Sequence, residues 1–255
     1  MILTIDIGNT NITLGGFVSD ELKFVSRIST DPLKTDDEYA IRILESLALY
    51  EIEKTEITGV MIASVVPPLN TVMKRAIQFV FKKDPVFVGP GIKSGIGIQC
   101  DMPSSVGADL IAAAVAAHYI YGSPSLIVDI GTATKMTVVN HKGAFIGTSI
   151  IPGVMMGLNA LALGTAQLPK ISLEVPNAVI AKNTADCMRS GVLFGNAGLI
   201  DGMIDRINEE FGEELKVYAT GGMATTMIPL CKHEIYVDEH LVLKGLNILY
   251  QKNRA

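Results

Sequence analysis

The motif IDIGNTN at residues 5–11 is the most informative feature of this sequence, because a variant of it, VDIGTAT, occurs again at residues 128–134. Each copy follows a short apolar run of strand-forming residues and precedes a second such run. The two aspartates, Asp6 and Asp129, lie about half the chain apart. Strand-forming runs on both sides of a glycine turn are typical of a β-hairpin. The sequence therefore predicts one hairpin unit that is present twice.

In each copy a strand ends at an aspartate and the chain then turns at a glycine. Glycine has no Cβ, so backbone N–H groups at the turn can approach a phosphate closely. The carboxylate offers hard oxygen for the Mg²⁺ that accompanies phosphates. One copy alone also fits an ordinary tight turn. Two copies at this spacing favour two turns that grip a nucleoside triphosphate from both sides.

The composition describes a folded protein of modest negative charge. Apolar residues make up 49% and charged residues 18%, which predicts a packed core rather than disorder. The net charge is −5 and no run of Lys or Arg exceeds two residues, which argues against nucleic acid as a partner. The most apolar stretch, residues 150–168, is broken by Pro and Gly and so does not predict a membrane span.

Three cysteines, odd in number and far apart, indicate neither a disulfide framework nor a zinc site. They fit a reducing compartment, and a strand that begins at residue 2 leaves no room for a signal peptide, so we expect a cytoplasmic protein. Cys187 and Cys231 are interpreted as buried small residues.

The order of elements predicts an α/β protein whose two halves share one plan. The first half contains strands and helices, expected at residues 2–7, 11–18, 22–29, 35–50, 59–64, 86–88 and 110–121, with a further helix that starts at Pro67 and includes Val80. Residues 89–107 are rich in Gly and Pro and predict no clear element, and Asp109 falls in the first turn of the helix that follows. The second half repeats the plan, with elements expected at residues 125–140, 143–151, 153–163, 184–211, 216–219, 235–237 and 240–251. We therefore predict domains at 1–115 and 116–255.

This organisation resembles the duplicated actin-like (ribonuclease H-like) ATPase fold, in which two mixed-sheet domains flank a nucleotide cleft. Within that superfamily the chain is similar to the type III pantothenate kinase family. The landmarks that carry the resemblance follow the family's order: DIGNT at 6–10, SVVPP at 64–68, GPG at 89–91, GAD at 107–109, DIGTAT at 129–134, PG at 152–153, TAQLP at 165–169, KNT at 182–184, SG at 190–191 and ATGG at 219–222.

The resemblance implies that the protein transfers the γ-phosphate of ATP to pantothenate, giving 4'-phosphopantothenate in the first step of coenzyme A biosynthesis. The residues implied to bind ATP are Asp6, Gly8, Asn9, Thr10, Gly131, Thr132, Thr134, Gly221 and Gly222. Asp6 would hold Mg²⁺ through the phosphates. Asp129 would lie at a monovalent-cation site for K⁺ or NH₄⁺. Gly221 and Gly222 would pass close to the adenine or ribose.

The resemblance also assigns the acceptor side of the site. Asp109 is the implied base, and a carboxylate within hydrogen-bond reach of a hydroxyl can accept its proton. Gly107, Ala108 and Cys100 would lie beside pantothenate. The family acts as a homodimer with a shared site, so Thr184 would come from the partner subunit.

The chain departs from the family around the acceptor. Family members commonly have Tyr-x-Asn-Pro before the Gly-Ala-Asp motif and Arg after it, whereas this chain has Cys100, Met102 and Leu110 at the corresponding places. Loss of an Arg that pairs with a carboxylate removes a charge-assisted contact. One interpretation is drift, with pantothenate still bound through other groups. The other is a paralogue with a different acceptor, or a nucleotide-binding regulator without kinase turnover.

Lys135 directly follows the second turn, where a Thr or another small residue is usual in the family. One hypothesis places its ammonium near the phosphates or the cation site. The alternative is a solvated lysine at the start of a strand.

Overall fold

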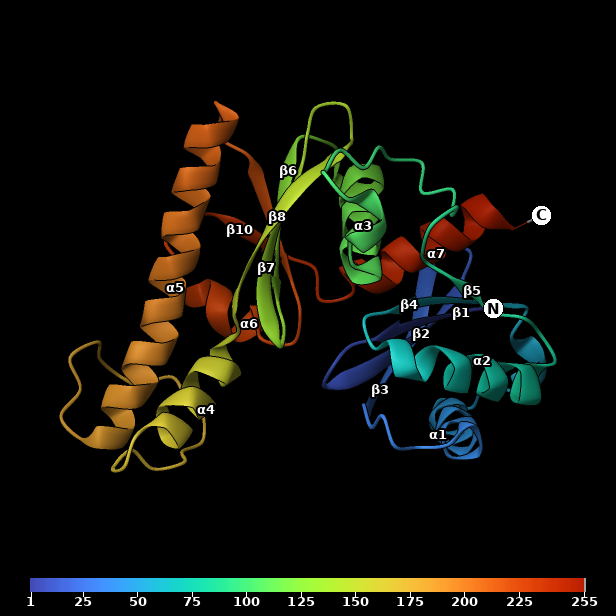
Figure 1. The fold of residues 1–255 in the computed structure, drawn as a ribbon, viewed down its shortest axis with the longest axis horizontal. Coiled ribbons are helices and arrows are strands. Elements are labelled where there is room, and N and C mark those ends of the chain that lie inside the picture. The colour runs from blue at the N-terminus through green and yellow to red at the C-terminus, as the bar shows by residue number, and fades with distance from the viewer. Residues whose placement is uncertain (255) are drawn as a thin grey trace. The chain divides into compact units, whose positions relative to one another are not determined.

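The computed structural model describes residues 1–254, which divide into two compact units (Figure 1). Unit 1 comprises residues 1–123, 142–145 and the chain from 240 onward, and unit 2 comprises residues 124–141 and 146–239. Each unit is built on its own five-stranded mixed sheet.

The sheet of unit 1 is led by a hairpin. Its strands are β1 (Ile2–Ile7), β2 (Asn11–Val18), β3 (Glu21–Ser29), β4 (Gly59–Ser64) and β5 (Val86–Phe87), in the spatial order β3-β2-β1-β4-β5. The first three strands are antiparallel neighbours, whereas β4 runs parallel to β1 and β5 parallel to β4. The three strands expected at residues 2–7, 11–18 and 22–29 are therefore present as an antiparallel meander.

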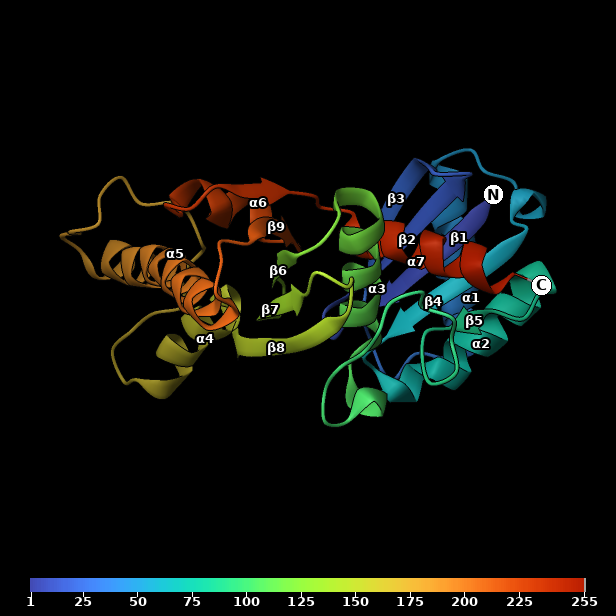
Figure 2. The same cartoon turned by 90° about the horizontal axis from the view of Figure 1, so that it is seen from above.

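Helices cover both faces of this sheet, because side chains alternate along a strand. Leu3, Ile5 and Ile7 of β1 face a core shared with α1 (Asp36–Leu49) and α2 (Pro67–Phe81). The opposite face packs against α3 (Ala108–Ala116) and α7 (Leu241–Asn253), which lie side by side in Figures 1 and 2. Asp6 alternates with the residues of the first core, so it belongs to the face covered by α3 and α7.

Unit 2 repeats the strand order of unit 1. Its strands are β6 (Ser125–Ile130), β7 (Ala133–Val139), β8 (Phe145–Pro152), β9 (Lys216–Thr220) and β10 (Ile235–Val237), in the order β10-β9-β6-β7-β8. Its helices are α4 (Val154–Gly164), α5 (Thr184–Phe211) and the short α6 (Ala224–Met227). Val128 and Ile130 of β6 pack in a core with α4 and α5, so Asp129 belongs to the opposite face.

Local sequence signals explain how several elements begin and end. Thr35 caps α1 and Glu38 completes a capping box, with Glu38 N to Thr35 Oγ1 at 3.3 Å and Thr35 N to Glu38 Oε2 at 2.9 Å. The helix expected at 110–121 is wrong in detail: α3 ends at Ala116 and continues as one π-helical turn, Ala117–Tyr121, which Gly122 closes at φ 89°. Further short 3₁₀ turns lie at Lys54–Glu56, Pro103–Ser105 and Ile228–Leu230.

By packing, α7 belongs to unit 1, where it lies along α3. The division at residues 115 and 116 followed the repeated plan of the sequence and stays a prediction. Every helix within residues 1–254 is too short or too polar to cross a membrane.

The expectation for Cys187 is wrong, because its side chain is exposed. Cys231 is half-buried, and desolvation, with Asp201 nearby, raises the pKa of its thiol to about 11.

Candidate active site

The first hairpin turn, between β1 and β2, is held by its own backbone and by Thr30, the residue directly after β3. Gly8 N donates to Asn11 O at 3.0 Å. Thr30 then fixes the turn twice, because its N donates to Thr10 O at 3.0 Å and its Oγ1 donates to Gly8 O at 2.7 Å. Sequence reasoning missed this role of Thr30. A hydroxyl residue directly after the third strand of a meander was the available signal.

This turn presents polar groups to solvent on a fixed backbone. Asn9 and Thr10 are exposed, whereas Asp6, at the end of the strand, is partly buried. Asp6 lies opposite Thr13 on β2 and Ala63 on β4. A carboxylate beside exposed amide and hydroxyl oxygens is a donor set that suits Mg²⁺. The structure thus brings together the four residues predicted for the first phosphate turn.

The second hairpin turn, between β6 and β7, adjoins a second glycine turn. Gly131 N donates to Ala133 O at 3.2 Å, and Met223 N donates to Ile130 O at 3.1 Å. Gly221 adopts φ 93°, and a Cβ added there would lie 2.6 Å from both Asp129 Oδ1 and Ile130 O. Glycine is therefore required at this position both for its backbone conformation and for the close approach. Within unit 2 the structure brings Gly131 and Gly221 to one place.

Asp129 is paired with Lys135 on the neighbouring strand. The two residues are directly opposite in the β6–β7 register, and Lys135 Nζ lies 2.7 Å from Asp129 Oδ2. Their side chains are only 18% and 16% exposed. The interpretation of Lys135 as a solvated lysine is therefore wrong. Its ammonium lies beside Asp129, the residue predicted for the cation site, and its proximity to phosphates stays a prediction.

Thr134 differs from its predicted neighbours in the second turn. It pairs with Ile130 and so points to the face that carries Met136 and the core of unit 2. The residue is 1% exposed, and its hydroxyl has no hydrogen-bond partner within residues 1–254. By contrast, Thr132 is exposed at the tip of the turn.

Asp109 occupies the first turn of α3 and is 9% exposed. Its Oδ1 accepts the backbone N–H of Leu110 at 2.9 Å. A Cβ added at Gly107 would lie 2.5 Å from the same oxygen, so Gly107 provides the space that this carboxylate fills. Acidic residues are common in the first turn of a helix, where they interact favourably with the helix dipole. Leu110 is 7% exposed and packs in the interior.

The segment before Asp109 carries the other predicted acceptor residues. Cys100 is half-buried with a free thiol, and Met102 is 66% exposed. Backbone bonds hold the segment to residue 145, from Gln99 N to Phe145 O at 2.8 Å and from Phe145 N to Gly97 O at 2.9 Å. The loop without predicted elements is therefore anchored at its centre.

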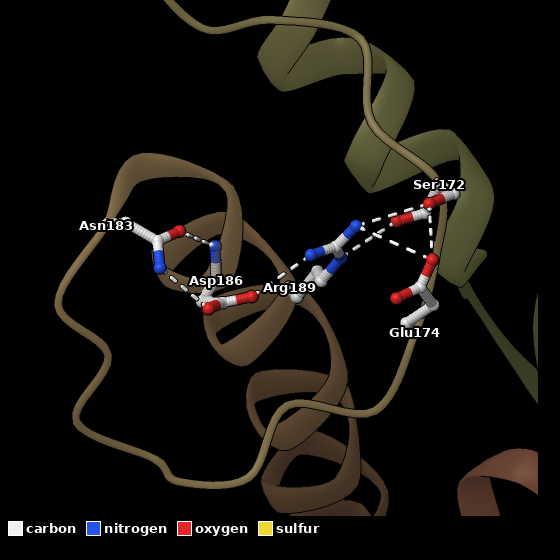
Figure 3. Close-up of polar contacts among 5 residues, drawn as sticks. All are labelled: Ser172, Glu174, Asn183, Asp186 and Arg189. Atoms are coloured by element: carbon white, nitrogen blue, oxygen red, sulfur yellow. Dashed lines mark hydrogen bonds and ion pairs between the residues drawn. The ribbon is translucent and has the colours of Figure 1, made fainter.

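Thr184 begins α5 in unit 2 and is exposed. The helix is capped by Asn183, whose Oδ1 accepts from Asp186 N at 3.0 Å while its Nδ2 donates to Asp186 Oδ2 at 2.8 Å. Arg189 donates to Asp186 Oδ1 at 3.0 Å and to Ser172 O at 3.0 Å (Figure 3). Hydrogen bonds from Asn183 and Arg189 hold the pKa of Asp186 below its usual value.

This polar network tethers the segment before α5, which has no helix or strand. Arg189 reaches Glu174 as well as Ser172, so one guanidinium joins residues 172–174 of the loop to the first turns of α5 (Figure 3). A pocket of about 360 Å³ opens beside the network and is lined in part by Lys182, Asp186 and Arg189. Arg189 is not among the residues predicted for the site.

Each of the two sheets has the same strand order and begins with a hairpin that carries an Asp-x-Gly turn. This architecture is the fold of actin-like ATPases and sugar kinases, as predicted. A ROK hexokinase from Thermus thermophilus has this fold, with a TM-score of 0.55 at 11% identity, and the match covers 99% of each chain. Component A of (R)-2-hydroxyglutaryl-CoA dehydratase from Acidaminococcus fermentans matches with a TM-score of 0.58 at 15% identity, over 98% of this chain and 96% of the other.

Sequence comparison narrows the class to a family. The type III pantothenate kinase family model matches residues 2–206. A type III pantothenate kinase of Geotalea daltonii is 43% identical over 254 residues, which covers 100% of this chain and 99% of the relative. The chain belongs to the type III pantothenate kinase family, whose members are phosphotransferases that act on an alcohol group.

Proposed function

We propose that this chain phosphorylates pantothenate with ATP, the first step of coenzyme A biosynthesis, through its two hairpin turns and Asp109. The observation that carries the proposal is the duplicated Asp-x-Gly turn in a chain that is 43% identical over its full length to a type III pantothenate kinase. The reaction takes place in the cytoplasm. Phosphoryl transfer depends mainly on positioning and on neutralising charge, which fixed turns can supply.

The first turn binds phosphate oxygens through its backbone and holds the metal. Gly8, Asn9 and Thr10 contact the phosphates, and the support for this is a turn that Thr30 fixes from outside. Asp6 would hold Mg²⁺ through the phosphates, and the metal would supply Lewis-acid neutralisation of phosphate charge. A turn that is rigid before the nucleotide arrives loses little conformational entropy on binding.

The second turn contacts the nucleotide through Gly131 and Thr132, together with Gly221 and Gly222. The close packing of Gly221 against Ile130 supports a shared role for the two glycine turns. Thr134 completes this set by resemblance, and its buried hydroxyl, which has no partner among residues 1–254, is consistent with contact to a ligand or water. The resemblance also implies a monovalent cation beside Asp129. In this chain Lys135 pairs with Asp129 and already places a positive charge there.

Asp109 acts as the base. The hydroxyl oxygen of pantothenate attacks the γ-phosphorus of ATP, and the bond from that phosphorus to the β–γ bridging oxygen breaks. The hydroxyl proton passes to a carboxylate oxygen of Asp109, and ADP leaves with the bridging oxygen. The support is a largely buried carboxylate whose position is fixed by Gly107 and the N–H of Leu110.

Pantothenate lies beside Gly107, Ala108 and Cys100, and Thr184 of a second copy completes the pocket in a homodimer. Support for a dimer comes from α4, where Met155, Met156 and Leu163 are 42%, 49% and 77% exposed. Large apolar side chains gathered on one helix are typical of an interface. A monomer in sedimentation equilibrium would remove Thr184 from the site.

The departures around the acceptor do not require a different substrate. Leu110 stands where the family commonly has Arg. Its side chain is buried, so it is a core residue rather than an altered contact with the acceptor. This favours drift over a changed acceptor. The assay described next also distinguishes the two alternatives, a nucleotide-binding regulator and a kinase for another hydroxyl compound.

The test is a coupled assay of ADP release with Mg²⁺, with and without pantothenate, on the wild type and Asp109→Asn. We expect pantothenate-dependent turnover that the substitution lowers by at least about a hundredfold, since a general base contributes about that much or more. Asp101→Asn makes the same change at an exposed position of the preceding loop and should keep the wild-type rate. ATP binding without ADP release would instead identify a regulator, and turnover with other alcohols alone would identify a different kinase.

A further inference from the structure

Lys135 and Asp129 form an ion pair that is largely removed from solvent. Nζ and Oδ2 are 2.7 Å apart, and the two side chains are 18% and 16% exposed. The residues face each other across β6 and β7, so the backbone register itself holds them together. Partly buried pairs are screened by salt much less than exposed ones. The pair therefore persists at physiological ionic strength.

The same carboxylate links the ammonium to the glycine turns of unit 2. While Oδ2 of Asp129 binds Lys135, its Oδ1 lies where a Cβ on Gly221 would approach to 2.6 Å. Oδ1 is also within ordinary contact of a Cβ added at Gly131, at 3.5 Å. The positive charge of Lys135 is thus fixed beside the two glycine turns of unit 2, at Gly131 and Gly221, which are proposed to contact the nucleotide.

A monovalent metal cation at Asp129 does not fit this donor set. The ammonium already occupies Oδ2, and a second cation on the same carboxylate would be repelled in a partly buried site. Additional carboxylates could offset that repulsion. Residues 1–254, however, hold no cluster of three or more His, Cys, Asp or Glu side chains able to bind a metal ion.

We propose that Lys135 is the built-in cation of this site, so that nucleotide binding and turnover need neither potassium nor ammonium ions. Lys135 is a positioning residue that acts through Asp129: it cancels a carboxylate charge that would otherwise repel phosphates beside the glycine turns. The inference rests on the proposed function. Thr13, which lies opposite Asp6 in the first hairpin, shows that a neutral residue fits this register position. Lys135→Thr is therefore the natural substitution.

The experiment measures two quantities in potassium chloride and in choline chloride at equal ionic strength. The first is the affinity for a nonhydrolysable ATP analogue by calorimetry, and the second is pantothenate-dependent ADP release. In the wild type we expect both to agree between the salts within about twofold. In Lys135→Thr, affinity and rate in choline chloride should fall by about tenfold or more, as for loss of a charge-assisted contact, and potassium or ammonium should restore them.

Two variants control the interpretation. Lys135→Arg keeps the cation and should remain independent of potassium. Lys216→Thr makes the same change at an exposed position of β9 and should behave as the wild type in both salts. If Lys135→Thr proves unfolded by circular dichroism, Lys135→Met keeps the length of the side chain without its charge and takes its place.

Stimulation of the wild type by potassium of more than about fivefold, in affinity or rate, would overturn the inference. So would a Lys135→Thr variant that ignores potassium in both measurements. Binding that is independent of salt in the wild type and depends on potassium in the variant, without any turnover on pantothenate, would sustain the inference and refute the proposed function. Absence of nucleotide binding in either salt would refute both.

Discussion

The two hairpin turns occupy the same place in their sheets but differ in the residues beside their aspartates. Across three neighbouring strands, unit 1 has Thr13, Asp6 and Ala63. Unit 2 has the row Lys135, Asp129 and Thr220 at the same position. The duplicated backbone therefore fixes where each carboxylate lies, and its neighbour on the next strand sets what it can bind. An uncharged neighbour suits a divalent metal, whereas an ammonium makes the site neutral.

The strongest test of this comparison substitutes each aspartate in turn. Asp6→Asn should lower the rate of ADP release by about a hundredfold or more, because a metal that neutralises transferring phosphate contributes several kcal/mol. It should also raise the Mg²⁺ concentration needed for half-maximal rate. Asp129→Asn should leave that Mg²⁺ concentration unchanged. A magnesium titration of both variants measures the difference.

Asp129→Asn has a different expected cost. It leaves the ammonium of Lys135 mostly buried without its carboxylate, which should lower the free energy of unfolding by about 1–3 kcal/mol. Urea denaturation measures this, and the double variant with Lys135→Thr should recover part of the loss. Equal shifts in Mg²⁺ requirement for both aspartate variants would remove the proposed division of labour.

The fold was predictable because its signals are local and occur twice. The repeated Asp-x-Gly turn, the capping box at Thr35 and Glu38, and the strand-forming runs each fix an element through neighbouring residues. The packing of α7 in unit 1 was not predictable in the same way, because no local pattern states which sheet a terminal helix covers. The π-helical turn after Ala116 was also missed, since the alanine-rich pattern continues across it.

The candidate site was predictable in its backbone groups and less so in its side-chain partners. Gly107 and Gly221, which the sequence singled out as site residues, each lie against an aspartate, and the proposed contacts of Gly221 with adenine or ribose stay a prediction. The partnership of Lys135 with Asp129 depends on strand register, which the turn length sets, and the second turn is one residue shorter than the first. Thr30 and Arg189 act over many residues in sequence, and the only signal was the position of Thr30 directly after a predicted strand.

A smaller effect sharpens the contrast in how the turns are held. Gly221→Ala places a Cβ at φ 93° and within 2.6 Å of Asp129 Oδ1, so we expect a loss of about 1–3 kcal/mol in the free energy of unfolding. Gly222→Ala is the matched control for stability, because a Cβ there meets nothing within 4 Å. Equal unfolding midpoints for both variants in urea would contradict the packing of Gly221 against the second turn.

The smallest expected effects come from one threonine in each half, and they have opposite signs. Thr30→Val removes the hydrogen bond to Gly8 O at 2.7 Å and should lower the free energy of unfolding by about 1 kcal/mol. Thr134→Val removes a buried hydroxyl that has no partner within residues 1–254, so stability should stay level or rise by up to about 1 kcal/mol.

Urea denaturation with and without the ATP analogue separates folding from binding for these two variants. A desolvated hydroxyl without a partner is costly to the folded chain. The hydroxyl of Thr134 is explained if it forms a hydrogen bond with the bound nucleotide or with a water molecule on that nucleotide. In that case Thr134→Val is the more stable protein alone but gains less stability from the analogue than the wild type does. An equal gain would mean that Thr134 does not contact the nucleotide, and the second turn would then bind through Thr132 and its backbone.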